Sequence, residues 1–142
     1  LDESGETSSE NNSSVVSLLN FDDKKFLFTG DAGIPALKNV INFSESVGID
    51  ISSVYWKQVP HHGSQRNISP SILDSIRTTI AYVSASKGAP KHPNFKVTNA
   101  YIRRGASVYT TEGIPLLHKL NCDMRSGYST AAKFEFQSKV QE

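Results

Sequence analysis

The feature that most constrains this chain is the regular alternation of apolar, strand-like runs with segments of helical pattern. The strand-like runs, several of them rich in β-branched and aromatic residues, cover 15–21, 26–30, 54–59, 80–86 and 106–111. The segments with helical spacing or helix-starting residues cover 36–47, 69–79 and 95–105. The order is therefore β-β-α-β-α-β-α-β, and trailing strands are expected at 115–120 and 131–137. This alternation predicts the α/β class with a layered sheet-and-helix architecture.

Length and composition indicate one globular domain. The chain has 142 residues, of which 37% are hydrophobic and 20% are charged, and its net charge of +1 does not by itself indicate a polyanionic partner. A single cysteine, Cys122, excludes an internal disulfide and a zinc site built from several cysteines. The apolar runs are far shorter than the ~20 residues that span a bilayer. We therefore expect no membrane segment in this chain and a cytoplasmic location.

The first 14 residues differ from the rest. Residues 1–14 are acidic, rich in Ser and Asn, and almost free of apolar side chains, which predicts a flexible linker or loop ahead of a domain at 15–142. The chain begins with Leu1 and not with Met, so we expect it to be a piece of a longer protein.

Chemically active side chains follow three successive predicted strands. Asp31 follows 26–30, His61 and His62 follow 54–59, and His92 follows 80–86. Functional residues of α/β sheets collect at the carboxyl ends of strands. Imidazole and carboxylate groups are ligands of zinc and manganese, and one carboxylate can bridge two ions. Such ions lower the pKa of bound water and can clamp the oxygens of a displacement reaction.

Each of these residues also has a structural interpretation. Asp31 could cap a helix, the histidine pair could hydrogen-bond to backbone in a turn, and His92 could be an ordinary loop residue. His118, within 115–120, is expected to be structural or on the surface. The chain also offers few ligands, because a catalytic zinc needs at least three from the protein.

Two stretches resemble a known fold. The segments "NNSSVVSLLNFDDKKFLFTGDA" (11–32) and "VPHHGSQRNISPSILDSI" (59–76) resemble the C-terminal half of the metallo-β-lactamase fold. In particular they resemble the branch found in bacterial DNA-uptake competence channel proteins and their stand-alone hydrolase relatives. Four motifs in order carry the resemblance: Asn11/Asn12/Ser14, Thr29-Gly30-Asp31, His61-His62-Gly63-Ser64 and His92-Pro93.

The resemblance implies half of an αββα sandwich, that is, a mixed sheet with helices packed on one face. The metal site would lie where the two halves meet and would hold two zinc or manganese ions. Asp31 matches the bridging aspartate, and His62 matches the histidine ligand. His61 would be its neighbour on the metal or substrate side, and His92 a further ligand, a substrate contact or a proton donor. The expected substrate-side residues are Ser64, Asn12 and Lys91.

The resemblance also implies that part of the site lies elsewhere. The family's His-x-His-x-Asp-His motif belongs to the N-terminal half, which is absent here. We therefore expect the missing N-terminal half of the same fold as a partner, and we expect this chain alone to be inactive.

The predicted function is the C-terminal portion of a metal-dependent hydrolase that acts on a phosphodiester, possibly in nucleic acid, or on another ester. Basic side chains near the site-forming loops could hold phosphate or simply be solvated: Lys57, Arg66, Lys87, Lys91 and Lys96. The alternative is a non-catalytic binding or structural module that retains the fold. An unrelated flavodoxin-like domain would have no use for the histidine pair, and the opening hairpin argues against it.

Overall fold

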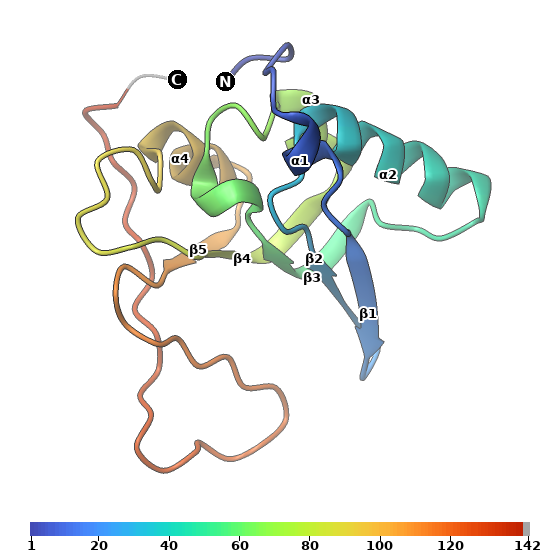
Figure 1. Cartoon of the computed structure of the whole chain (residues 1–142). Coiled ribbons are helices and arrows are strands. Elements are labelled where there is room, and N and C mark those ends of the chain that lie inside the picture. Colours follow the sequence, from blue (N-terminus) through green and yellow to red (C-terminus); the bar gives the residue numbers. More distant parts are fainter. Residues whose placement is uncertain (141–142) are drawn as a thin grey trace.

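The strands form one mixed sheet in the order in which they occur in the chain (Figure 1). The computed structural model describes residues 1–140. Within them the sheet contains β1 (Ser17–Phe21), β2 (Lys24–Phe28), β3 (Ser53–Gln58), β4 (Arg77–Val83) and β5 (Ser107–Thr110). β1 and β2 are an antiparallel hairpin, and β2 to β5 run parallel to one another. The predicted α/β class with a mixed sheet is confirmed.

The helices lie on one side of this sheet, as Figure 1 shows. They are α1 (Ser9–Asn12), α2 (Ile34–Ser46), α3 (Pro70–Ser75) and α4 (Phe95–Arg103), and a short 3₁₀ turn, η1 (Pro60–Gly63), follows β3. Parallel strands that succeed one another in a single direction, joined by right-handed crossovers, leave every connecting helix on the same face. The topology therefore explains why the predicted packing of helices on one face is observed.

The core lies between this face and the helices. One row of buried side chains crosses four strands in register: Leu27, Lys57, Ala81 and Val108, each 0–1% exposed. Leu37 of α2, Ile72 of α3 and Val97 of α4 belong to the buried cluster that covers the sheet. Burial of these apolar side chains stabilises the contact between the helical layer and the sheet.

The other face of the sheet is aromatic. Trp56 contacts Phe28 and Tyr82 with ring centroids 5.1 and 5.3 Å apart, and Tyr82 contacts Tyr109 at 5.1 Å. In the described residues no helix covers this face; the segment after β5 loops beneath the sheet instead (Figure 1). His118 of that segment packs against Tyr82, with ring centroids 5.9 Å apart, but Phe28 remains 41% exposed.

The trailing strands predicted at 115–120 and 131–137 are wrong, since the last strand in residues 1–140 is β5. The Phe134 N–H donates to the Val108 carbonyl at 2.7 Å, which places the second segment beside β5. The Gln137 N–H then donates to Asn99 Oδ1 of α4 at 2.9 Å. The segment turns from the sheet edge toward the helices and does not extend a ladder. The helix predicted over 69–79 is also shorter, because Arg77 already begins β4.

Residues 1–14 lie against the helical side of the molecule. The Glu3 carboxylate accepts the Ser71 N–H at 2.8 Å, at the start of α3, and residues 9–12 form α1. The segment predicted to be a flexible linker thus has a short helix and defined contacts, while its mobility stays a prediction. No helix in residues 1–140 is long and apolar enough to cross a membrane.

Candidate metal centre and adjoining cleft

The ends of three parallel strands bring the four predicted site residues together. Asp31 follows β2, His61 and His62 lie in η1 after β3, and His92 follows β4. His62 Nε2 lies 4.0 Å from Asp31 Oδ1. The ring of His61 lies 5.8 Å from that of His62 and 6.0 Å from that of His92, measured between centroids. Adjacent parallel strands end at the same edge of a sheet, which is why residues so far apart in sequence meet.

Hydrogen bonds join the end of β2 to the end of β3. The Thr29 and Gly30 N–H groups both donate to Gln58 Oε1 at 3.2 Å, and Thr29 Oγ1 donates to the Gln58 carbonyl at 2.9 Å. The His61 N–H donates to the Gly30 carbonyl at 3.1 Å. These bonds hold the loop that carries Asp31 against the loop that carries the histidines.

The histidine turn has a strained backbone. His61 and His62 have φ values of 44° and 56°, and Gly63 follows at 77°. The left-handed conformation costs a residue other than glycine about 1–2 kcal/mol, and such strain concentrates at functional sites. A Cβ on Gly63 would lie 3.2 Å from Val83 Cγ1, so the turn also needs a small residue there. Asp22 and Asp23 adopt the same conformation in the turn between β1 and β2, so the backbone geometry alone does not assign a function to the histidine turn.

His62 is held as a potential metal ligand. Its Nδ1 lies 2.7 Å from the Ser84 carbonyl oxygen. A carbonyl can only accept, so Nδ1 must carry the hydrogen, and neutral His62 keeps its lone pair on Nε2. Nε2 is the atom that faces Asp31. Metal-binding histidines typically donate their second ring nitrogen in this way, which fixes the ring and its tautomer.

The two donors fit a zinc or manganese ion, but they form only part of a ligand set. Asp31 and His62 supply a carboxylate and an imidazole lone pair, and their side chains are 46% and 50% exposed. In residues 1–140 no group of three or more His, Cys, Asp or Glu side chains is arranged to hold a metal ion. Both side chains are about half exposed to solvent.

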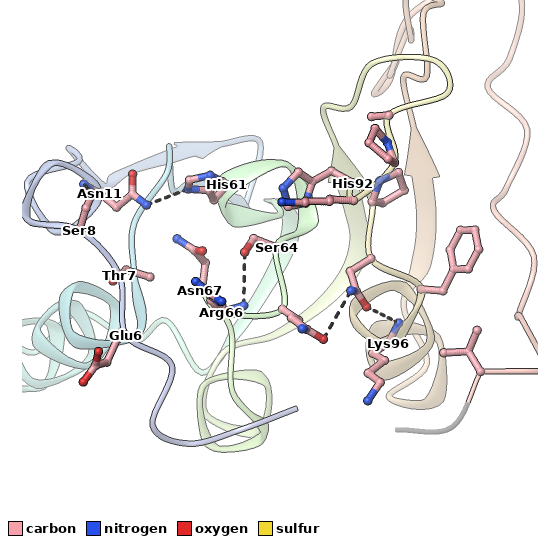
Figure 2. A pocket seen from close by; sticks show the side chains of 18 of the residues that line it. Glu6, Thr7, Ser8, Asn11, His61, Ser64, Arg66, Asn67, His92 and Lys96 are labelled. Carbon is pink, nitrogen blue, oxygen red and sulfur yellow. Dashed lines mark hydrogen bonds between the residues drawn. The ribbon is translucent and has the colours of Figure 1, made fainter.

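A cleft of about 840 Å³ lies beside the histidine turn (Figure 2). His61 and His92 line it, whereas Asp31 and His62 lie outside its wall. His61 thus stands between the Asp31–His62 pair and the cleft. The charged side chains of the lining are Arg66, Lys91, Lys96, Glu6 and Glu112. Positive groups outnumber negative ones, which favours an anionic ligand.

The predicted substrate-side residues occupy different places. Ser64 and Lys91 line the cleft, and Ser64 Oγ accepts the Arg66 N–H at 3.3 Å. Asn12 is not in the lining; its Oδ1 accepts from Thr7 Oγ1 at 3.1 Å. The neighbouring Asn11 lines the cleft instead, and its Nδ2 lies 2.9 Å from His61 Nδ1 (Figure 2). Sequence reasoning missed this contact, because two adjacent asparagines carry no signal of which one faces inward.

The remaining histidines have distinct surroundings. Partial burial, together with His61, His62 and Lys91 nearby, lowers the pKa of His92, which keeps its imidazole neutral at pH 7. His92 Nδ1 is buried and, within residues 1–140, without a hydrogen-bond partner. His118 lies on the opposite face of the sheet, where it packs on Tyr55 and Tyr82. A structural role for His118 thus agrees with its contacts.

One basic residue is misplaced by the sequence prediction. Lys57 was expected near the site-forming loops, but it is 0% exposed and faces the helices from the second-to-last position of β3. Alternation along the strand explains this, because Gln58, the next residue, points toward the end of β2. Arg66, Lys91 and Lys96 do line the cleft.

Comparisons with known proteins give one relative. The chain is 32% identical over 107 residues to Recombination protein 2 of Haemophilus influenzae, a match that covers 74% of this chain and 13% of that protein. The chain therefore corresponds to a small part of this relative's length. No family model and no solved structure matches the chain.

Proposed function

We propose that this chain is the C-terminal portion of a metal-dependent hydrolase of the metallo-β-lactamase fold, acting on a phosphodiester or another ester. The observation that carries the proposal is the Asp31–His62 pair. The Ser84 carbonyl fixes the His62 tautomer, so that Nε2 offers its lone pair toward Asp31 Oδ1, 4.0 Å away. Similarity to a protein named Recombination protein 2 supports a nucleic-acid phosphodiester as the substrate.

The residues divide into two groups by chemistry. Asp31 and His62 would hold zinc or manganese, which when bound supplies Lewis acidity and activates water near neutral pH. On the cleft side, Arg66, Lys91 and Lys96 would bind the phosphate. His92, which lines the cleft as a neutral imidazole, would contact the substrate.

The proposed enzyme needs a second part. A catalytic zinc has at least three protein ligands, and the described residues supply two that fit. The open aromatic face of the sheet offers an apolar surface for the N-terminal half of the fold, which would bring the remaining ligands. We therefore propose that this chain alone binds metal weakly and does not turn over substrate.

Metal titration and hydrolysis assays with paired variants test the proposal. Asp31→Asn and His62→Gln are expected to weaken Zn²⁺ or Mn²⁺ binding about tenfold or more in calorimetric titrations of the longer protein. The same variants should lower its hydrolysis of bis(p-nitrophenyl) phosphate about 100-fold or more. Glu45→Gln is the matched control, because it neutralises an exposed carboxylate on α2, on the helical side of the sheet. Unchanged hydrolysis in both Asp31→Asn and His62→Gln would overturn the site assignment.

A non-catalytic binding module is the second candidate. Two observations favour it: the described residues supply only two side chains that fit as metal ligands, and the lining of the cleft is basic. In that case Lys91→Gln and Lys96→Gln would weaken binding of an oligonucleotide to the longer protein, whereas Asp31→Asn would leave it unchanged. Hydrolysis that depends on added metal would exclude this alternative.

A further inference from the structure

We propose that Asn11 is a positioning residue that fixes His61 as the tautomer with its hydrogen on Nε2. The two adjacent histidines then have opposite roles. His62 offers a lone pair toward Asp31, while His61 donates a hydrogen bond to an anionic oxygen in the cleft. The assignment of these roles rests on the proposed function, but the tautomer itself does not depend on it.

The hydrogen bond between Asn11 and His61 determines the tautomer. Asn11 Nδ2 lies 2.9 Å from His61 Nδ1. An amide nitrogen can only donate, so Nδ1 must accept, and the hydrogen of the neutral ring must then be on Nε2. The bond of His62 has the opposite polarity, because its Nδ1 donates to the Ser84 carbonyl.

This tautomer argues against His61 as a metal ligand through Nε2. Ligation at that atom would need its lone pair, and the ring hydrogen would have to move to Nδ1. There it would point at the Asn11 N–H, and the bond would be lost. As long as Asn11 donates, His62 is the histidine of the pair that can bind the metal.

Contacts of the backbone and of neighbouring residues hold the segment that carries Asn11 in place. Ser8 Oγ accepts the Asn11 N–H at 3.3 Å and caps α1. Asn12, next to it, is bound to Thr7. A Cβ on Gly33, at the start of α2, would come closer than 3.0 Å to Thr7 Oγ1 and Asn12 Oδ1. The absence of a side chain at position 33 therefore lets this segment approach close enough for Asn11 to reach His61.

The location of His61 indicates which group would accept a hydrogen bond from its Nε2–H. The ring lines the same cleft as the basic residues Arg66 and Lys96 (Figure 2), and its centroid lies 5.8 Å from that of His62. A ring N–H donor at this position complements a phosphate oxygen, which only accepts. Bound between His61 and the basic residues, an anionic ester would have its reactive end next to the pair.

Nitrogen NMR of the histidines tests the tautomer without any metal. The chain is labelled with ¹⁵N-histidine and kept about two pH units above the usual histidine pKa, so that the rings are neutral. Long-range ¹H–¹⁵N correlation spectra then show which nitrogen carries the hydrogen. His61 should show it on Nε2 and His62 on Nδ1. A hydrogen on Nδ1 of His61 would overturn the inference.

Asn11→Asp reverses the chemistry of the contact. A carboxylate only accepts, so His61 should move its hydrogen to Nδ1, while His62 and His118 keep their patterns. Asn42→Asp, at an exposed position of α2, is the matched control and should leave His61 unchanged. If Asn11→Asp leaves the His61 tautomer unchanged while the His118 signals show an intact fold, Asn11 does not fix the tautomer.

The outcomes separate this inference from the proposed function. The expected tautomers together with an absence of metal binding by the longer protein would support Asn11 as the positioning residue and refute the hydrolase. Metal-dependent hydrolysis together with a hydrogen on Nδ1 of His61 would support the hydrolase and refute the role of Asn11.

Discussion

At the scale of single residues, Lys57 shows how far the folded environment can change a side chain. It is fully buried, its Nζ has no hydrogen-bond partner within residues 1–140, and Nζ lies 5.6 Å from the centre of the Tyr101 ring. Burial lowers the pKa of Lys57 from its ordinary value of 10.5 to about 7. In the unfolded chain the Lys57 amine is charged and hydrated. Folding must therefore either remove its proton or bury its charge without a partner, and both lower the stability of the folded protein.

We predict that Lys57→Met stabilises the protein. Between pH 7 and 10.5 the unfolded wild-type chain binds more protons at this residue than the folded protein does. Wild-type stability should therefore rise with pH across this window, and the full penalty should remain below pH 7. Lys57→Met removes the penalty and should raise the free energy of unfolding by about 2–4 kcal/mol at pH 7, with a smaller gain near pH 10.

Urea unfolding at several pH values measures this effect. Lys119→Met, at an exposed position, serves as the control and should follow the wild-type profile. Parallel pH profiles for the wild type and Lys57→Met would show that burial does not shift the lysine as described.

At the scale of elements, the site depends on how closely α1 approaches the start of α2. Gly33 lies at the N-cap of α2 with a φ of −83°, a conformation that alanine also adopts. An added Cβ, however, would come too close to Thr7 and Asn12. Gly33→Ala is therefore expected to displace residues 7–12 while leaving α2 intact.

Proteolysis measures that displacement. Cleavage after Glu6 and Glu10 by a glutamate-specific protease should become several times faster in Gly33→Ala. Ser46→Ala, at the other end of α2, should cleave at the wild-type rate. An unchanged rate in Gly33→Ala would mean that residues 7–12 accommodate the methyl group where they are.

At the scale of the whole molecule, the sheet has two unlike faces. Helices cover one face, and the other exposes apolar side chains of the β1–β2 hairpin. Leu19, Phe21 and Phe28 of this hairpin are 52%, 60% and 41% exposed. Antiparallel pairing of Leu19 with Phe26 places them on the same face as the aromatic residues of β3 and β4. An exposed face of this kind is typical of a surface that another part covers.

We predict that this face binds the N-terminal half of the fold. Phe21→Ser combined with Phe28→Ser should weaken association with that half, supplied as a separate chain, at least about tenfold, since burying one phenylalanine contributes about 1.5–3 kcal/mol. Sedimentation or calorimetry measures the affinity. Phe43→Ser is the matched control, because Phe43 is 64% exposed on α2. An equal loss in the control would mean that the aromatic face is not the binding surface.

The sequence by itself determined the order of the strands and of the longer helices. Apolar periodicity is local, so it predicted the strands β1 to β5 and the helices α2, α3 and α4, but not α1, whose segment is almost free of apolar side chains. The positions of Asp31, His61, His62 and His92 after strands predicted their convergence, because parallel strands share their carboxyl edge. The sequence did not determine the path of 131–137, since alternation alone does not say whether a partner strand is accessible.

Only the tertiary structure decided which side chains contact one another and which of them donates in each hydrogen bond. It turned Asn11, and not Asn12, toward His61, because the orientation of α1 depends on its contacts with Thr7 and Gly33. It assigned opposite tautomers to two adjacent histidines, because each tautomer depends on a partner distant in sequence, Asn11 for one and the Ser84 carbonyl for the other. It buried Lys57 because the helices cover that face of β3. Contacts between residues that are distant in sequence form only in the folded chain, so no local sequence pattern predicts them.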